Sequence, residues 1–379
     1  MNILLATDAN LERGGITLFM LQWICGIREV DKNGKICVYF RDHVEDKELE
    51  KQYLDLGTTI YTGNIPRNVR FGNNDARKKV KADIREIITT DQIDVIHIHS
   101  GVFGYNLDLL SEAKRRGVQV RISHSHGAYP ERKIDKLIHF FMIPVIKQNA
   151  TLYAACSRKA GIYLFGKRGV SSGKWRFVPN TIQVNRFRFD NDERIKNRSK
   201  LEVKDDELLL GAVGHLNVGK NHAFLIEVLA ELRKNGIPVK LIVLGKGEQR
   251  ENLLKKSRQL GVEKEVILYG PVPNVSKFLS AMDIYLMPSQ SEGLGISAVE
   301  AQANGLPCLL SDRFPEEVVM TPEVFCLPID QGIDLWVEKI KELRSCRRER
   351  IMGAELVKKA GFDESNTADY VKLLYGMNI

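Results

Sequence analysis

Two cysteine patterns are missing from this sequence. Its 379 residues include six cysteines, and no two of them form a Cys-x-x-Cys pair. Closely spaced cysteines are the usual ligands of structural zinc, and many cysteines in a short chain indicate a disulfide scaffold. We therefore expect reduced, mostly buried thiols and no metal site. The six are Cys25, Cys37, Cys156, Cys308, Cys326 and Cys346.

Long hydrophobic runs are also missing. The most apolar stretch, residues 137–146, is about half as long as a membrane-spanning helix and is interrupted by His139 and Pro144. The first residues, MNILLATD, contain neither a basic leader nor an apolar core of signal-peptide length. These features predict a cytoplasmic protein without a transmembrane helix.

The glycine pattern of dinucleotide-binding proteins, G-x-G-x-x-G, does not occur at the expected turns. The turn 8-DANLERGGIT-17 has two adjacent glycines, and Arg250 replaces the third glycine in 245-GKGEQREN-252. The first turn either lets a ligand approach the backbone closely or is simply flexible. The second is interpreted as a simple turn. The missing pattern argues against a nicotinamide-dependent oxidoreductase.

Basic residues outnumber acidic ones, which gives a formal net charge of +8. Such a charge favours anionic partners, which include nucleic acid, anionic membranes and phosphorylated small molecules. The sequence contains no recognisable nucleic-acid-binding module. We therefore expect a membrane surface or a phosphorylated ligand, and no nucleic acid.

Short apolar runs alternate with segments of helical period along most of the chain, which is the pattern of parallel sheets covered by helices. The alternation pauses at residues 166–206 and then resumes. It predicts two doubly wound α/β domains, residues 1–180 and 181–360. Ligands of such domains bind beyond the carboxyl ends of the strands, so we expect a site in the cleft between the two. The expected strands are residues 3–7, 36–40, 94–99, 118–123, 151–156, 208–214, 239–245, 265–270, 283–289 and 307–311.

The stretch GHLNVGKNH follows one of these expected strands and matches part of the P-loop template. Gly214, Gly219 and Lys220 fit the template, but Asn221 stands where Ser or Thr would hold magnesium. Lys220 would then neutralise phosphate directly, helped by the amides of a helix N-terminus. The alternative is that the segment only caps the helix that begins near Asn221.

A second polar loop contains the segment SEGLGISAVEA. Glu292 is followed by Gly293 and Gly295, which offer bare amides and a positive helix end to an anion. Glu300 would lie about one turn inside the helix, where a carboxylate can accept two hydrogen bonds from a ribose diol. The alternative is a capping box formed by Ser297 and Glu300.

These loops resemble those of the retaining glycosyltransferases of family four, and SEGLGISAVEA is similar to their E-x7-E signature. The resemblance covers nearly the whole chain. It implies the GT-B arrangement of two facing Rossmann-like domains with an inter-domain cleft, and a C-terminal helix in 361–379 that packs on the N-terminal domain. The other landmarks, in the order of the family, are 14-GG-15, 94-DVIHIHS-100, 121-RISHSHG-127, 179-PNTIQVNRF-187, 214-GHLNVGKNH-222 and 283-DIYLMPS-289.

The resemblance also implies how a nucleotide sugar binds to the second domain. Glu300 would bind the ribose hydroxyls, Glu292 the hydroxyls of the donor sugar, and Lys220 the diphosphate. His215 stands where the family usually has arginine, so phosphate binding would depend more on Lys220 or on another basic group. The remaining donor-site candidates are Gly15 from the first domain, Val272 and Lys277 near the base (Lys277 could equally be a solvated helix lysine), and the amides of Gly293, Leu294 and Gly295.

The resemblance places a histidine of the first domain near the reacting sugar. His124 and His126 both fit, and His126 is preferred because a glycine follows it. His97 and His99 alternate along one expected strand, so at least one of them is structural. The catalytic candidates are therefore His126, Lys220 and Glu292.

The function implied is that of a metal-independent hexosyltransferase without a cofactor. It would move a sugar from a nucleotide sugar, with uridine favoured as the base, to a glycan or lipid-linked acceptor in exopolysaccharide or capsule synthesis. Retention of configuration is implied by the resemblance alone. Two alternatives are a nucleotide-sugar epimerase, which would lack the E-x7-E context, and a non-catalytic sugar-nucleotide or membrane-binding protein.

Residues 131–148 combine basic and apolar side chains. A basic amphipathic helix of this kind can lie on an anionic membrane, and with the positive net charge it suggests peripheral contact with the cytoplasmic leaflet. The alternative is a surface helix that packs its apolar side on the sheet. The residues concerned are Arg132, Lys133, Lys136 and Lys147, with Leu137, Ile138, Phe140 and Phe141.

Overall fold

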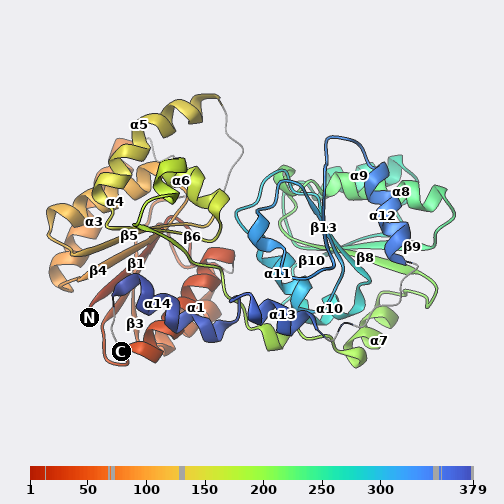
Figure 1. Ribbon diagram of the computed structural model, residues 1–379, viewed down its shortest axis with the longest axis horizontal. Helices are drawn as coiled ribbons and strands as arrows, with labels where there is room; N and C mark the ends of the chain where they lie inside the picture. Colours follow the sequence, from red (N-terminus) through yellow and green to blue (C-terminus); the bar gives the residue numbers. More distant parts are fainter. Residues whose placement is uncertain are drawn as a thin grey trace. The chain divides into compact units, whose positions relative to one another are not determined.

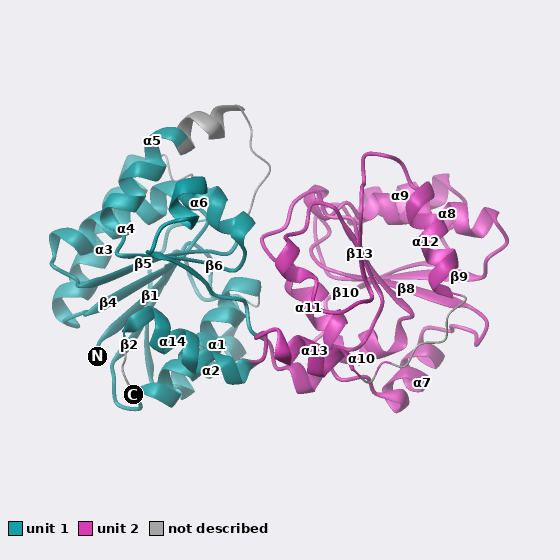
Figure 2. Cartoon of the chain, in the orientation of Figure 1, with its two compact units in different colours: residues 1–181, 364–379 teal, residues 182–363 magenta. Residues whose placement is uncertain are grey.

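The structure is a computed structural model that describes residues 1–12, 14–66, 69, 73–127, 133–344, 350 and 352–376, without the side chains of residues 133–139. The chain forms two compact units (Figure 2). Unit 1 contains residues 1–181 and 364–379, and unit 2 contains residues 182–363. Each unit has its own parallel sheet (Figure 1).

The described part of unit 1 contains a seven-stranded sheet in the order β3-β2-β1-β4-β5-β6-β7. Neighbouring strands are parallel throughout. The order reverses between β1 and β4, which is the switch point of a doubly wound fold. The strands are β1 (Ile3–Thr7), β2 (Ile36–Phe40), β3 (Thr58–Thr62), β4 (Val95–His99), β5 (Val120–Ser125), β6 (Leu152–Ala155) and β7 (Trp175–Phe177).

Helices cover both faces of this sheet. In β1, Leu4 packs into one core with α3 and α4, while Ile3 and Leu5 pack into a second core with α1 and α14. This double burial explains why the central strands are continuous apolar runs. The helices of unit 1 are α1 (Gly15–Val30), α2 (Lys47–Asp55), α3 (Asn74–Thr90), α4 (Phe103–Arg115), α5 (Lys133–Asn149), α6 (Arg158–Val170), the 3-10 helix η4 (Glu364–Asn366) and α14 (Thr367–Tyr375).

The C-terminal helix α14 belongs to unit 1 and packs against α1. Trp23 on α1 donates a hydrogen bond of 2.8 Å from its indole nitrogen to the hydroxyl of Tyr375. Val371 and Leu374 complete the same core. The last described helix therefore closes the domain in which the chain began.

The described part of unit 2 contains a six-stranded parallel sheet in the order β10-β9-β8-β11-β12-β13. The order again reverses once, between β8 and β11. The strands are β8 (Leu208–Val213), β9 (Val239–Leu244), β10 (Val266–Gly270), β11 (Ile284–Met287), β12 (Cys308–Ser311) and β13 (Val324–Leu327). The helices are η1 (Val184–Phe187), α7 (Asn191–Lys200), η2 (Val218–Lys220), α8 (His222–Lys234), α9 (Arg250–Gln259), α10 (Val275–Ala281), α11 (Ile296–Ala303), η3 (Glu316–Val318), α12 (Asp334–Arg344) and α13 (Gly353–Lys359).

The two doubly wound sheets confirm the predicted fold class, and all ten expected strands are present within two residues of their predicted bounds. Three further strands, β3, β7 and β13, were not predicted. All three lie at the edge of a sheet and are only partly buried. An edge strand is covered less completely, so it needs no continuous apolar run and gives a weaker sequence signal.

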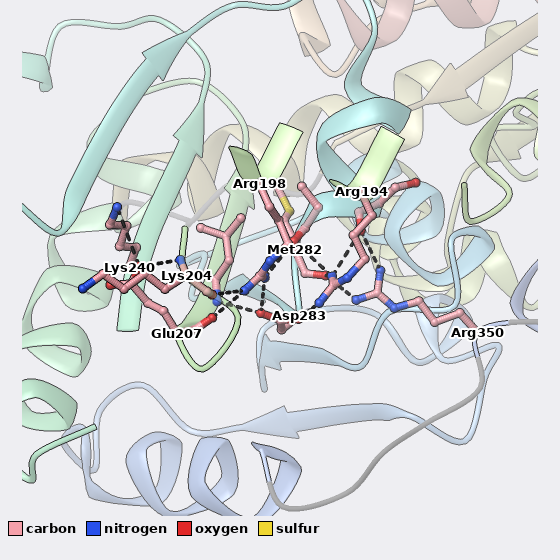
Figure 3. A network of polar contacts seen from close by, with 11 residues as sticks. Arg194, Arg198, Lys204, Glu207, Lys240, Met282, Asp283 and Arg350 are labelled. Atoms are coloured by element: carbon pink, nitrogen blue, oxygen red, sulfur yellow. Dashed lines mark hydrogen bonds and ion pairs between the residues drawn. The ribbon is translucent and has the colours of Figure 1, made fainter. Parts of the chain in front are cut away.

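A polar network at the amino ends of the strands of unit 2 fixes α7 to the sheet (Figure 3). Asp283, just before β11, pairs with Arg194 at 2.6 Å and with Arg198 at 2.9 Å, both on α7. It also accepts a hydrogen bond from the amide of Leu209. Burial raises the pKa of Asp283, but the two arginines and this amide outweigh burial and hold that pKa below its usual value. Arg350 adds a hydrogen bond to the carbonyl of Met282.

Replacement of Asp283 by Asn should lower the free energy of unfolding by about 3 kcal/mol at neutral pH, because Arg194 and Arg198 would lose a largely buried partner. The contribution of the carboxylate is present above the unfolded-state pKa of about 3.9 and is lost as the pH falls through the lower folded-state pKa. The difference between wild type and variant should therefore close in strong acid. Urea unfolding between pH 3 and 7 measures both.

The matched control for this experiment is Asp330→Asn. Asp330 pairs with Arg313 at 2.9 Å on the surface, with 64% of its side chain exposed. Exposed pairs contribute at most about 1 kcal/mol. Equal losses in the two variants would show that the Asp283 network has no special role in stability.

Candidate active site

The site in unit 2 lies where the strand order reverses. Strands β8 and β11 are neighbours, although the chain leaves them toward opposite sides of the sheet. The loops after these two strands therefore meet at the carboxyl edge, where ligands of doubly wound sheets bind. The amide of Gln290, after β11, donates to the carbonyl of Gly219, after β8, at 2.8 Å.

An ion pair joins the two loops. Nζ of Lys220 lies 2.5 Å from Oε1 of Glu292. The stem of the lysine passes over Gly214, where an added Cβ would be 3.5 Å from its Cε. Side-chain exposure is 24% for Lys220 and 10% for Glu292. The structure thus brings together two residues that the sequence marked separately, and it holds the ammonium at the mouth of the loop.

The loop after β8 is built differently from a P-loop. Asn217 accepts a hydrogen bond from the amide of Lys220 at 2.9 Å and so closes the short 3-10 turn η2. Asn221 then adopts a left-handed backbone with φ 56° before α8 begins. Asparagine tolerates this conformation better than most residues, and the β-branched Thr of many P-loops tolerates it poorly. Asn221 is the N-cap of α8 by position, but its side chain makes no cap hydrogen bond.

His222, the first residue of α8, was quoted with this loop but given no role. It is buried, and burial lowers its pKa to about 4, with a smaller effect from Lys220. A neutral buried imidazole brings no charge to a phosphate. Lys220 is therefore the charged group that this loop offers.

The turn 245–247 supports the loop after β8 from beneath. A Cβ on Gly245 would lie 2.0 Å from the carbonyl oxygen of Gly214, and one on Gly247 would lie 2.4 Å from that of Leu216. The amide of Leu216 donates to the carbonyl of Lys246 at 2.9 Å. The two glycines are thus required by close backbone packing.

The loop after β11 reaches its helix through Gly295. This residue has φ 87°, and a Cβ on it would lie 2.4 Å from the ring of Phe314. Leu294 is 2% exposed and anchors the loop in the core. Gly293 lies between Glu292 and this anchor. The backbone at 293–295 therefore has a fixed course into the N-terminus of α11.

The alternative of a capping box at Ser297 is wrong. The N-cap of α11 is Gly295, and Ser297 lies inside the first turn. Its hydroxyl accepts from the hydroxyl of Tyr285 at 2.8 Å and donates to the carbonyl of Val213 at 3.1 Å. Ser297 thus joins the ends of β8 and β11 to the helix, and Glu300 is left for another role.

Glu300 lies on the second turn of α11 and is partly buried. Burial raises its pKa to about 7, and the charge of Arg186 opposes this rise. The carboxylate therefore changes its charge near neutral pH. Arg186 was not predicted, although it lies in the landmark PNTIQVNRF. Nothing in its sequence neighbourhood indicates that η1 packs against α11.

The other donor-site candidates of unit 2 lie in different surroundings. His215 is exposed, and its carbonyl accepts from the amide of Asn217. Val272 is partly buried in the loop after β10. Lys277 pairs with Glu193 on α7 at 2.8 Å, which gives it a role in holding α10 to α7.

In unit 1, Gly15 begins α1 directly after the loop that follows β1, and it is exposed. Thr17 orders this turn, because its hydroxyl accepts from the amide of Gly14 at 3.0 Å and donates to the carbonyl of Glu12 at 2.5 Å. The loop presents backbone at the carboxyl edge of the sheet.

Four histidines gather on one face of β4 and β5, beneath Phe19 of α1. His97, His99 and His124 are fully buried, and His126, at the end of β5, is partly exposed. Burial is the main cause that lowers the pKa of each ring, and for His126 the result is about 4. All four imidazoles are therefore neutral at pH 7.

Hydrogen bonds order these rings in two chains. The hydroxyl of Tyr375 contacts Nδ1 of His97 at 3.0 Å, and Nε2 of His97 contacts Nδ1 of His124 at 3.1 Å. In the second chain, His126 contacts His99 at 3.0 Å and Oδ1 of Asn180 at 3.2 Å. With Oδ1 of Asn180 assigned as the acceptor, His126 donates from Nδ1 and accepts at Nε2. Both of its ring nitrogens are then engaged.

Ligand nitrogens of His97, His99 and His124 lie within 4.8 Å of one another, a spacing that could hold a metal ion. In the structure, however, Nε2 of His97 is hydrogen-bonded to Nδ1 of His124, and Nδ1 of His99 is hydrogen-bonded to His126. Hydrogen bonding accounts for the cluster better than metal coordination does.

Comparison with known proteins agrees with this geometry. Residues 193–359 match the model of the family described as glycosyl transferases group 1. The chain is 29% identical to the putative glycosyltransferase EpsF of Bacillus subtilis over 98% of this chain and 95% of that protein. The chain is thus similar to the group 1 glycosyl transferases within unit 2, and its similarity to EpsF extends over nearly its whole length.

This chain is also similar to two further proteins. It is 23% identical to the Escherichia coli enzyme named UDP-Gal:alpha-D-GlcNAc-diphosphoundecaprenol alpha-1,3-galactosyltransferase, over 76% of this chain and 77% of that one. The crystal structure of Anabaena HepE in complex with UDP superposes with a TM-score of 0.77, at 15% identity and with both chains fully covered. This likeness concerns the fold alone, and it assigns the chain to the GT-B fold class.

The segment 131–148 is described in part. Residues 131 and 132 and the side chains of 133–139 lie outside the described residues, and with them Arg132, Lys133, Lys136, Leu137 and Ile138. Within α5, Phe140 and Phe141 are 73% and 63% exposed. No helix among the described residues is both long and apolar enough to cross a bilayer.

The charge change of Glu300 predicts a pH-dependent affinity for UDP. A carboxylate accepts hydroxyl hydrogen bonds best when it is ionised, and with a pKa of about 7 the ionised fraction falls roughly tenfold between pH 8 and pH 6. The affinity should fall by about the same factor. Titration calorimetry of wild type and Glu300→Gln over this range is the measurement.

The Gln variant serves as the control because the terminal phosphate of UDP titrates in the same range, with a second pKa of about 6. That effect occurs in both proteins, so only the difference between them reports Glu300. Parallel pH curves would remove Glu300 from the binding site.

Proposed function

We propose that this protein transfers a hexose, with retention of configuration, from a UDP-sugar to a lipid-linked or glycan acceptor in the synthesis of a cell-surface polysaccharide. One observation carries the proposal. The Lys220–Glu292 ion pair lies at the switch point of the sheet in unit 2, at the N-terminal end of the helix that carries Glu300. A cation for a diphosphate and two carboxylates for hydroxyls are thus held by one pair of adjacent loops.

The first step of the proposed reaction depends on charge at the leaving group. As the glycosidic bond breaks, the nucleoside diphosphate departs with increased negative charge. Lys220 supplies a fixed positive charge where that charge develops, and the amides at the N-terminus of α11 add to it. Preorganised donors of this kind do not need to reorient during the reaction. We propose on this basis that the transfer does not require a metal ion.

The two carboxylates have separate roles in this proposal. Glu300 binds the ribose hydroxyls, and Glu292 binds hydroxyls of the donor sugar while it orients Lys220. The 2.5 Å contact between Lys220 and Glu292 couples sugar binding to phosphate binding, because the same carboxylate serves both. The backbone at 293–295 and near Val272 completes the donor site.

We assign acceptor binding to unit 1. Within this unit, Gly15 is assigned to the diphosphate of the donor and His126 to the reacting sugar. Because His126 is neutral and both of its nitrogens are engaged by His99 and Asn180, we assign it to orientation of the sugar and not to proton transfer. Its fixed ring limits the positions that the reacting groups can adopt.

The names of relatives support the choice of substrates. HepE was crystallised with UDP, and the name of the E. coli relative includes UDP-galactose and a diphosphoundecaprenol-linked sugar. A basic chain suits both the nucleotide diphosphate and the diphosphate of such an acceptor. We therefore choose UDP-sugars and diphosphoundecaprenol-linked sugars as the first substrates to assay.

Lys220→Ala should lower the turnover of sugar transfer by roughly 10²–10³-fold, the usual cost of losing one donor that stabilises a developing anion. The assay follows radiolabelled sugar from a panel of UDP-sugars into a diphosphoundecaprenol-linked acceptor. Lys234→Ala is the matched control, since Lys234 lies at the other end of α8 and is 79% exposed. Near-normal turnover of Lys220→Ala would exclude the lysine from the mechanism, and no transfer by wild type would contradict the proposed function.

A lipid-linked acceptor requires access to a membrane surface, and we propose that α5 provides it. Phe140 and Phe141 are the exposed apolar groups of this helix that the structure describes, and Lys147 follows on the same helix. Aromatic side chains that enter the headgroup region and nearby basic residues act together in interfacial helices. The protein would then work peripherally on the cytoplasmic leaflet.

Flotation with anionic liposomes tests this contact. Binding at low salt should weaken at high salt, because screening reduces the attraction of basic residues to the surface. Phe140→Ser with Phe141→Ser should weaken binding at both salt concentrations, whereas Leu335→Ser, at an exposed leucine of unit 2, should not. Absence of wild-type binding at low salt would end this part of the proposal.

A further inference from the structure

Arg186 is an exposed arginine of unit 2 that has no role in the function proposed above. It lies in η1, the short 3-10 helix at the start of unit 2, between the buried residues Val184 and Phe187. The side-chain amide of Asn304 donates to the carbonyl of Phe187 at 2.9 Å and fixes η1 to the end of α11. The backbone is thus held in place, while Arg186 itself is exposed.

The guanidinium of Arg186 interacts with two parts of the proposed donor site. Its Nη2 donates to the carbonyl of Pro273, in the loop after β10, at 3.4 Å. It also acts electrostatically on Glu300. The loop after β10 is where the base is proposed to bind, and Glu300 is where the ribose is proposed to bind. Arg186 therefore adjoins both halves of a nucleoside.

The chemistry of the side chain narrows what it recognises. A guanidinium carries five N–H donors and no acceptor. Within the described part of the chain, one of these donors forms a long hydrogen bond to the carbonyl of Pro273. The remaining donors suit a ring carbonyl oxygen, which uracil and guanine have and adenine lacks. Opposite adenine, the donors would meet the exocyclic amino group, which is itself a donor.

We propose that Arg186 is a base-specificity residue that donates hydrogen bonds to a ring carbonyl of the nucleoside and thereby favours uridine over adenosine donors. The inference rests on the proposed function, because it uses the nucleotide site formed by Lys220, Glu292 and Glu300. It goes beyond that function by assigning the choice of base to a side chain outside the E-x7-E loop. The charge of Arg186 also helps to keep Glu300 ionised while it binds the ribose.

Binding of UDP, GDP and ADP to the full-length protein tests the specificity. Arg186→Ala should weaken UDP binding about 10- to 100-fold, which is the range expected for the loss of a charge-assisted hydrogen bond. At a pH well above 7, where Glu300 stays ionised in every variant, ADP binding should change little, so the preference for UDP over ADP should narrow. GDP should follow UDP, because guanine also has a ring carbonyl.

The matched control is Arg188→Ala. Arg188 lies two residues further along and is similarly exposed, but it binds Asn185 and pairs with Glu355. Its removal should change UDP affinity by less than about threefold, as expected for an exposed ion pair. If both variants lose affinity equally, the effect is one of general positive charge and the assignment to Arg186 is overturned.

A second readout does not depend on the base. Loss of the arginine removes the charge that opposes the raised pKa of Glu300, so the pH below which UDP affinity declines should move upward in Arg186→Ala. Arg186→Lys, which keeps the charge, should restore this pH midpoint but not the base preference. The other ionisable groups nearby are Tyr285 of β11 and the Lys220–Glu292 pair, which all variants retain.

The outcomes distinguish failure of the proposed function from failure of the base-specificity role of Arg186. If wild type binds none of the three nucleotides, the proposed function fails. If wild type prefers UDP and Arg186→Ala keeps both that preference and the wild-type pH midpoint, the proposed function stands and this inference is overturned. Thermal unfolding of each variant confirms that it is folded, as expected for the exposed side chain of Arg186.

Discussion

The functional geometry of unit 2 depends on one constraint, which is that β8 and β11 lie side by side. The chain between them makes two crossovers before it returns, so Lys220 and Glu292 are 72 residues apart in sequence and 2.5 Å apart in space. Right-handed crossovers of a doubly wound sheet impose this neighbourhood whatever the loops contain. The backbone of 245–247 and the anchor at Leu294 then fix the two loops, so the ion pair results from packing and not from local sequence.

Charge is distributed unevenly across the site, and burial is the reason. Glu292 has a lysine as its direct ion-pair partner, whereas burial raises the pKa of Glu300 and the charge of Arg186 offsets this rise only in part. A partly buried carboxylate with a weak counter-charge gains most from a ligand that donates hydrogen bonds to it. Burial has the opposite effect on the histidines of unit 1, because it lowers the pKa of an imidazole and keeps the ring neutral. Four neutral imidazoles are linked by hydrogen bonds to one another, to Tyr375 and to Asn180, although Nε2 of His99 and Nε2 of His124 have no hydrogen-bond partner among the described residues.

The polar network at the other edge of unit 2 shows why such a site can be maintained. Asp283 and its arginines lie at the amino ends of the strands, away from the loops that carry Lys220 and Glu292. They tie α7 to the sheet without contact with those loops. Stability and chemistry are thus supplied from opposite edges of one sheet, as is usual for parallel α/β domains.

The sequence by itself predicted ten of the strands, the two-domain plan and Lys220, Glu292 and Glu300 as candidate site residues, because buried strands are largely apolar and because glycines and charges cluster in few loops. Other features were decided by the tertiary structure alone. Edge strands such as β3 are half covered and need no apolar pattern. Ser297 matches a capping box in sequence, yet its hydroxyl joins two strand ends instead. Arg186 and Asn180 gain their roles from residues more than 50 positions away, and Glu300 owes its pKa to burial. Local sequence patterns indicate which secondary structure the backbone forms. The hydrogen-bond partners and charge states of side chains depend instead on which distant elements fold against them.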